Sequence, residues 1–410
     1  MQLLVLDANS FWTERLFTEC ARFADVLLLK PREIRDYWRR RRRVLGDRSP
    51  RQLSEGVWEQ RLSMPPRWLF ELWPIGRWYL SRVLCQFKRR AEASVLVFSF
   101  PQYWDLVHRV APALSLYYNT DDYSDHWRHP NRPVDEVEAR AVQVADITIC
   151  IAKHRAEVLA KQFPERARHI YHLPIGCSPE LMVEDVQFDR PNLPNPLLDL
   201  GRPLIGYVGA LNWRFDYRFL IRVARQLPDV NFVLGGRIPI PADGNEGWWL
   251  DVVEARGLSN VHWIGWVPHG ELKQYLCSFD ALFATYARCR FNTNSCPAKL
   301  WDYLGTSLPI VANSAVPEIN NWQGVVRVAD TPVGFAQEIM WALEQDTLAD
   351  KRRRLGVARA HTWNRLSQRL HSILQTELQC GEDGVSPISL SPPGGTRRGV
   401  WKPADGFACI

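Results

Sequence analysis

The stretch that decides the fold reads Asn-Ser-Cys-Pro-Ala-Lys-Leu-Trp-Asp-Tyr-Leu-Gly-Thr-Ser-Leu-Pro-Ile-Val-Ala-Asn and spans residues 294–313. Its order predicts a helix start, a short helix that Gly305 ends, and a buried Ile-Val-Ala strand. Asn294 or Ser295 can cap this helix, and Pro297 suits its first turn, where an N–H would have no helical partner. The free amides and the positive dipole at such a start favour an anion, above all a phosphate.

Charged and apolar residues separate on this helix. Lys299 and Asp302 lie three positions apart and hence share one face, while Leu300 and Leu304 turn toward the sheet. We therefore expect a helix that packs on a sheet with its apolar side and carries two charges near its start.

Apolar strand-like runs alternate with helical segments along most of the chain, which predicts α/β architecture with parallel, doubly wound sheets. Residues 31–90 are expected to be helical and are unusually aromatic. The expected strands are 3–7, 26–29, 94–99, 114–118, 146–151, 167–174, 204–209, 231–236, 261–265, 280–284 and 310–312, and the expected helices include 12–23, 134–144, 154–162 and 217–226.

A segment rich in proline and asparagine divides the pattern at residues 186–203 and is expected to be a linker. With 410 residues, 46% of them hydrophobic, the chain can bury two cores. We expect Rossmann-like domains at 1–185 and 204–360, a helix at 361–380, and a disordered tail at 381–410 that is rich in Gly, Ser and Pro. Open parallel sheets bind ligands at the carboxyl ends of their strands, so a cleft between the domains is the expected site.

The positive charge gathers in the first quarter of the chain. Residues 1–90 hold 19 Lys and Arg against 10 Asp and Glu, and Arg39 to Arg43 form an unbroken run among several tryptophans. Aromatic rings beside cations suit an anionic membrane surface, so residues 32–90 are a candidate for peripheral membrane binding. The alternative is a solvated helix face with a few core tryptophans. No nucleic-acid-binding motif occurs elsewhere, so nucleic acid is not expected as a partner.

Targeting and redox signals are weak. No apolar run reaches the roughly 18 residues that span a bilayer, and the amino-terminus has no basic segment before an apolar core. The nine cysteines are scattered without metal-ligand spacing, which indicates reduced packing residues. We expect a cytoplasmic protein that contacts the cytoplasmic face of the membrane.

Several of these segments match a known family. In the second half they are Val208–Leu211, Asn260–Pro268, Pro297–Leu304 and Pro309–Ala312, and in the first half Tyr117–Ser124, Ala145–Ile149 and Leu173–Gly176. Together, across about residues 94–370, they resemble GT-B glycosyltransferases of the family-4-like, teichuronic-acid type. The resemblance implies two Rossmann-like domains, a nucleoside-diphosphate sugar as donor, and metal-independent chemistry without a further cofactor.

The resemblance also assigns roles. Retaining enzymes of this kind carry two acids eight positions apart, of which the second holds the ribose and the first touches the transferred sugar. Asp302 stands at the second position, but Asn294 replaces the first acid. Lys299 and Arg214 are the candidates to neutralise the diphosphate as it departs. The donor would also lie against Gly209, Ser295, Cys296, Pro297 and Ala298.

In the first half, many relatives have a histidine after the equivalent strand. This chain offers Asn119, Asp121 and Asp122 there, with His126 following. Asp121 and Asp122 are therefore candidate catalytic residues, and the alternative is that they form a turn or a cap. One acidic pair without further ligands is weak evidence for a metal.

These observations predict a retaining glycosyltransferase that moves a sugar from a nucleoside diphosphate to a glycan or lipid-linked acceptor. One alternative is a scaffold or partner subunit that keeps the fold without turnover, which the replacement by Asn294 favours. A second alternative is a nucleotide-sugar 2-epimerase, which shares the fold and would act on the donor alone.

Overall fold

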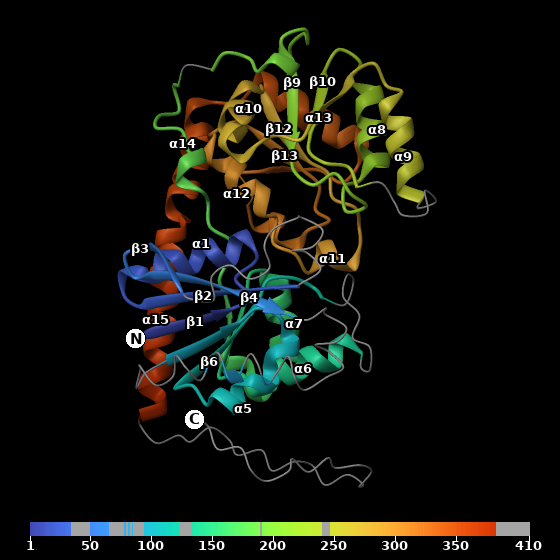
Figure 1. Ribbon diagram of the computed structural model, residues 1–410. Helices are drawn as coiled ribbons and strands as arrows, with labels where there is room; N and C mark the ends of the chain where they lie inside the picture. The colour runs from blue at the N-terminus through green and yellow to red at the C-terminus, as the bar shows by residue number, and fades with distance from the viewer. Residues whose placement is uncertain are drawn as a thin grey trace.

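The computed structural model describes residues 1–33, 50–64, 78, 81, 82, 84, 94–123, 133–188, 191–239, 247–322 and 324–382. Two parallel sheets, each flanked by helices, lie one above the other (Figure 1). The α/β architecture with two doubly wound halves is confirmed.

The first half contains, within the described residues, an eight-stranded sheet in the order β3-β4-β2-β1-β5-β6-β7-β8. All neighbours pair in parallel except β3 and β4. The apolar strands predicted at 94–99 and 114–118 are fully buried, as a sheet covered on both faces requires. The strands are β1 (Gln2–Leu6), β2 (Asp25–Glu33), β3 (Arg51–Ser54), β4 (Val57–Met64), β5 (Ser94–Phe98), β6 (Leu114–Asn119), β7 (Ile147–Cys150) and β8 (Ile170–His172), and the helices are α1 (Phe11–Glu19), α5 (Leu106–Val110), α6 (Val134–Val144) and α7 (Lys153–Gln162).

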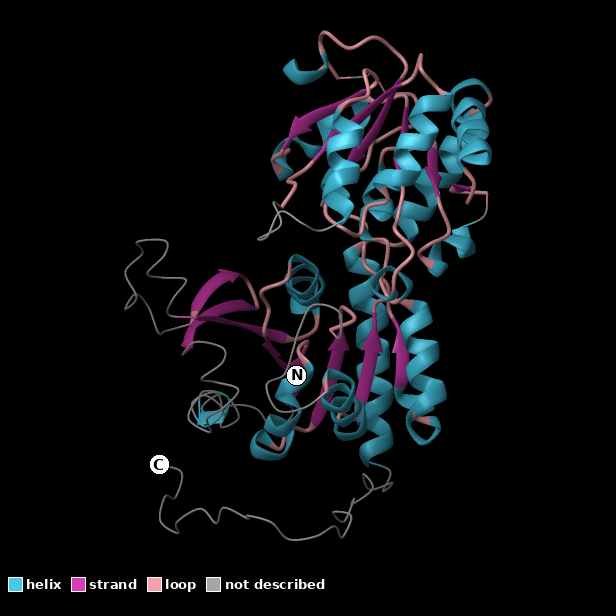
Figure 2. Ribbon diagram, turned by 90° about the vertical axis from the view of Figure 1, so that its right-hand side faces the viewer, coloured by secondary structure: helices cyan, strands magenta, loops and turns pink. Residues whose placement is uncertain are grey.

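The prediction of a helical segment over residues 31–90 is wrong at 51–64, where β3 and β4 form a hairpin that extends the first sheet (Figure 2). Gly56 makes the turn with φ of +70°, and β4 then pairs with β2 over eight residues. The sheet edge thus overrides the local aromatic pattern. Arg39 to Arg43 lie outside the described residues.

The second half contains, in the part of the chain that is described, a six-stranded parallel sheet in the order β11-β10-β9-β12-β13-β14. Every strand predicted there is confirmed, with β11 and β13 at the expected bounds. The strands are β9 (Leu204–Val208), β10 (Asn231–Gly235), β11 (Val261–Gly265), β12 (Ala281–Ala284), β13 (Ile310–Ala312) and β14 (Arg327–Val328), and the helices are α8 (Tyr217–Gln226), α9 (Gly247–Arg256), α10 (Leu272–Ser278), α11 (Arg290–Thr293), α12 (Ala298–Gly305), α13 (Pro332–Glu344) and α14 (Leu348–Ala360).

The last described helix, α15 (Trp363–Glu382), returns to the first half and runs beside its sheet (Figure 1). Trp363 is buried and stacks with Trp12 of α1, and Glu377 accepts a hydrogen bond of 2.6 Å from the Tyr171 hydroxyl. The chain therefore crosses between the halves twice, once before β9 and once before α15. These two crossings help to fix how the halves face each other.

Candidate active site

The start of α12 lies at the boundary between the two halves, and its capping differs from the prediction. Neither Asn294 nor Ser295 caps α12, whose N-cap is Pro297 without a side-chain hydrogen bond. The reason is α11, a short helix that the sequence analysis missed. Ser295 Oγ donates to the carbonyl of Phe291 at 2.6 Å and Asn294 Nδ2 donates to the carbonyl of Arg290 at 3.2 Å, so both side chains serve the end of α11.

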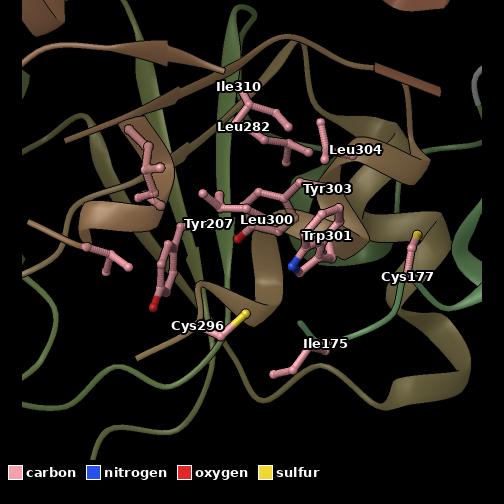
Figure 3. Close-up of a cluster of buried hydrophobic side chains, with 14 of the residues drawn as sticks. Ile175, Cys177, Tyr207, Leu282, Cys296, Leu300, Trp301, Tyr303, Leu304 and Ile310 are labelled. Carbon is pink, nitrogen blue, oxygen red and sulfur yellow. The ribbon is translucent and has the colours of Figure 1, made fainter. Parts of the chain in front are cut away.

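Packing and one hydroxyl fix α12 on the second sheet. Leu300 and Leu304 are fully buried, as predicted, and Figure 3 shows them beside Leu282 and Ile310 of the sheet. The Tyr303 hydroxyl accepts a hydrogen bond from the Val208 N–H at 2.9 Å and donates to the Val208 carbonyl at 3.2 Å. Helix α12 is thereby held to the end of β9.

Lys299 lies across the carboxyl end of β9. A Cβ atom added to Gly209 would come within 2.5 Å of Lys299 Cε, so a side chain there would displace the lysine. Its Nζ lies 5.0 Å from the ring centroid of Tyr207 and 5.4 Å from that of Tyr286, which makes two cation–π contacts. Burial and the neighbouring Arg214 lower the Lys299 pKa to about 8.

Arg214 comes from the loop after β9 and lies near Lys299. Its guanidinium stacks over Phe291 of α11 at 4.4 Å, and its Nε donates to Asn212 Oδ1 at 3.3 Å. Asp121, from the first half, is the acid that Arg214 influences. Burial raises the Asp121 pKa to about 6, while the positive charge of Arg214 acts against that rise. Asp121 and Arg214, two predicted site residues from different halves, are thus close enough to interact electrostatically.

Asp302 lies on α12, three positions after Lys299. Burial raises its pKa to about 7, and the nearby Ser178, in the segment after β8, acts against that rise. The side chain is only partly exposed but is not sealed from solvent. A carboxyl group with this pKa can accept hydrogen bonds from ribose hydroxyls when it is ionised.

Asp122 has different surroundings from its neighbour Asp121. It is 0% exposed, pairs with Arg290 Nε at 2.9 Å, and accepts a hydrogen bond from Asn294 Nδ2 at 2.7 Å. In this conformation its carboxylate joins the two halves. Arg290 was missed by the sequence analysis because a pair 168 positions apart leaves no local signal.

Asn119 belongs to the core beneath this region. It is buried and donates to Glu138 Oε1 at 2.8 Å, and Glu138 in turn pairs with Arg155. These contacts give it a structural role. His126 lies outside the described residues.

The described part of the chain can be searched for metal ligands and for membrane-spanning helices. Within it, no group of three or more His, Cys, Asp or Glu side chains is placed to hold a metal ion. The helices seen there are all too short or too polar to cross a membrane.

Comparisons with known proteins find glycosyltransferases. A glycosyl transferase-like family model matches residues 214–375, which include Arg214, Lys299 and Asp302. TuaH of Bacillus subtilis (strain 168), provisionally named a teichuronic acid biosynthesis glycosyltransferase, is 23% identical over 307 residues, which are 68% of this chain and 71% of TuaH.

Solved structures show the same fold over nearly the whole chain. An E. coli trehalose-6-phosphate structure bound with UDP-2-fluoro glucose matches with a TM-score of 0.66 and 11% identity, covering 92% of this chain and 99% of the other. Anabaena Alr3699/HepE in complex with UDP matches with a TM-score of 0.63 and 14% identity, covering 92% and 100%. The fold is GT-B.

Proposed function

We propose that this chain, a glycosyltransferase of the GT-B type, transfers the sugar of a uridine-diphosphate sugar to a hydroxyl group of a glycan or lipid-linked acceptor. The first half would hold that acceptor. The choice of uridine rests on the neighbours of the same fold, which were solved with UDP or a UDP sugar. The acceptor class rests on TuaH, whose name places it in teichuronic acid biosynthesis.

One observation carries the donor site. Lys299 and Arg214 converge at the end of β9, close enough that Arg214 lowers the pKa of the partly buried lysine. Holding two like charges together where both are partly shielded from water costs free energy, and a bound diphosphate would offset that cost. The diphosphate would lie between these cations and the start of α12, with the ribose toward Asp302.

The same groups suit the chemistry. The bond from the anomeric carbon to the diphosphate oxygen breaks as negative charge develops on the leaving group, which Lys299 and Arg214 stabilise. The acceptor oxygen forms its bond to that carbon and passes its proton to an oxygen of the departing diphosphate. Attack from the face that the diphosphate leaves retains the anomeric configuration, as the resemblance to retaining enzymes implies. Asp121, with its pKa near 6, would hold a hydroxyl of the sugar or the acceptor.

Transfer of labelled sugar from UDP-glucose and related donors to lipid-linked and soluble glycan acceptors tests this function. We expect transfer that needs an acceptor, with retention visible by NMR of the product. An epimeric sugar formed from the donor alone would indicate a 2-epimerase. Binding of UDP without any transfer across the acceptor panel would favour the scaffold.

The acceptor would bring the chain to the cytoplasmic face of a membrane through residues 32–90. Most of that segment lies outside the described residues, but Arg82 stacks over the exposed ring of Trp78 at 5.4 Å. Each cation near an anionic surface contributes about 1 kcal/mol, and salt screens it within roughly 8–10 Å. Replacing all five arginines at 39–43 with serine should reduce sedimentation with anionic vesicles by orders of magnitude at low salt. Wild-type protein that ignores such vesicles would refute the membrane contact.

A further inference from the structure

We propose that Asp122, Arg290 and Asn294 form an interdomain latch, and that position 294 carries an amide because Asp122 occupies the space beside it. This inference rests on the proposed function, since the latch positions the groups of that site. It assigns Asp122, Arg290 and Asn294 as positioning residues.

The latch joins the two halves at a buried point. Asp122 follows β6 of the first sheet and is fully buried, whereas Arg290 and Asn294 belong to α11 and its end in the second half. Both approach the same atom, Asp122 Oδ2, at 2.9 Å from Arg290 Nε and 2.7 Å from Asn294 Nδ2. Arg290 also reaches Asp135 at the start of α6 with a contact of 3.0 Å.

Charge explains the residue at 294. A buried carboxylate needs donors, and an amide N–H beside Asp122 supplies one. An acid at 294 would place a second carboxylate at hydrogen-bond distance from the first, and two such groups cannot both stay ionised. The departure from the acid that the resemblance predicts is thus matched by an acid supplied from the other half.

The latch is continuous with the proposed site. Asp122 directly follows Asp121, whose carboxyl group feels the positive charge of Arg214, and Asn294 directly precedes the segment that leads into α12 and Lys299. Forming the latch therefore sets Asp121 of the first half against the cations of the second. Breaking it should leave the donor groups in place but lose their alignment with the first half.

Four variants of the full chain test this. Asn294→Asp and Arg290→Gln should each break the latch. The exchange variant, Asp122→Asn with Asn294→Asp, should restore it, because the carboxylate then lies at 294 and the amide at 122. Arg225→Gln, which removes an exposed ion pair of the second half with Glu254, is the matched control. The readouts are UDP affinity by calorimetry, kcat with donor and acceptor, and the radius of gyration of the free chain by X-ray scattering.

We expect Asn294→Asp and Arg290→Gln to lower kcat by roughly ten- to hundredfold, the cost of a lost hydrogen bond to a charged group, with UDP affinity within about threefold of wild type. Both should enlarge the radius of gyration, and the exchange variant should recover most of kcat and compactness. Unchanged kcat and compactness in Asn294→Asp would overturn the latch. Because the scattering needs no activity, a wild-type chain that fails to bind UDP would refute the proposed function while leaving the latch to be judged by compactness.

Discussion

UDP binding should weaken at alkaline pH because Lys299 loses its proton there. The lysine is partly buried beside Tyr207 and Tyr286 with Arg214 nearby, and these surroundings lower its pKa to about 8. The cation is favoured below that pH and lost above it. A lysine with this pKa is about 90% charged at pH 7 and about 10% charged at pH 9.

If the diphosphate binds only the charged form, UDP affinity falls about ninefold between pH 7 and pH 9, or about 1.3 kcal/mol. The second ionisation of the terminal phosphate lies near pH 6, so the diphosphate changes little across this range. Calorimetry at each pH measures the effect, and binding should take up protons near pH 8 because the anion favours the cation.

Lys299→Met is the matched control, because it keeps the length and apolar contacts of the side chain without its charge. It should bind UDP more weakly at pH 7 by about 1.5–3 kcal/mol and should lose the alkaline dependence. Any dependence that remains belongs to the ligand or to other groups. Wild-type affinity that stays constant from pH 7 to pH 9 would refute the placement of the diphosphate at Lys299.

Three other changes give distinct outcomes. Asp302→Ala should weaken UDP binding by about 1–3 kcal/mol through lost ribose hydrogen bonds, and calorimetry with 2′,3′-dideoxy-UDP should show no such loss. Arg214→Ala should lower kcat more than it lowers donor affinity, because leaving-group charge is greatest in the transition state; steady-state kinetics showing loss in affinity alone would make it a ground-state contact. Gly206→Ala would place a Cβ atom 2.1 Å from the buried ring of Phe279 and should cost about 1–3 kcal/mol in urea unfolding, against no loss for Gly270→Ala, which has open space around it.

Local patterns predicted the strands and helices of both sheets well. Uninterrupted apolar runs such as 94–99 and 310–312 can only be buried strands here, and the bounds of α8 match the predicted 217–226. The stretch 294–313 also predicted its helix and strand. The prediction of the residues that cap α12 was wrong because α11 precedes this helix. A helix of four residues such as α11 has almost no periodicity to detect.

Pairing over long distances was beyond local patterns. The hairpin at 51–64 forms because β2 offers an open edge, which no window of its own sequence records. Likewise, the pairing of Asp122 with Arg290 depends on how two distant segments meet. Asp121 and Asp122 were predicted together because both follow the strand after which the resembled family carries a histidine, and the fold gives them different surroundings. The roles of the donor residues remain predictions.

Thermal unfolding in the presence of UDP, GDP, ADP and dTDP tests the central claim most directly, because a ligand that binds only the folded chain stabilises it more the more tightly it binds. At a concentration of one hundred times its Kd, a nucleotide should add about 2.7 kcal/mol to the free energy of unfolding. We predict that UDP raises Tm the most and that the Asp302→Ala and Lys299→Met variants lose most of this increase. If none of the four nucleotides raises the Tm of the wild-type chain, or if both variants respond as it does, the donor site described here is contradicted.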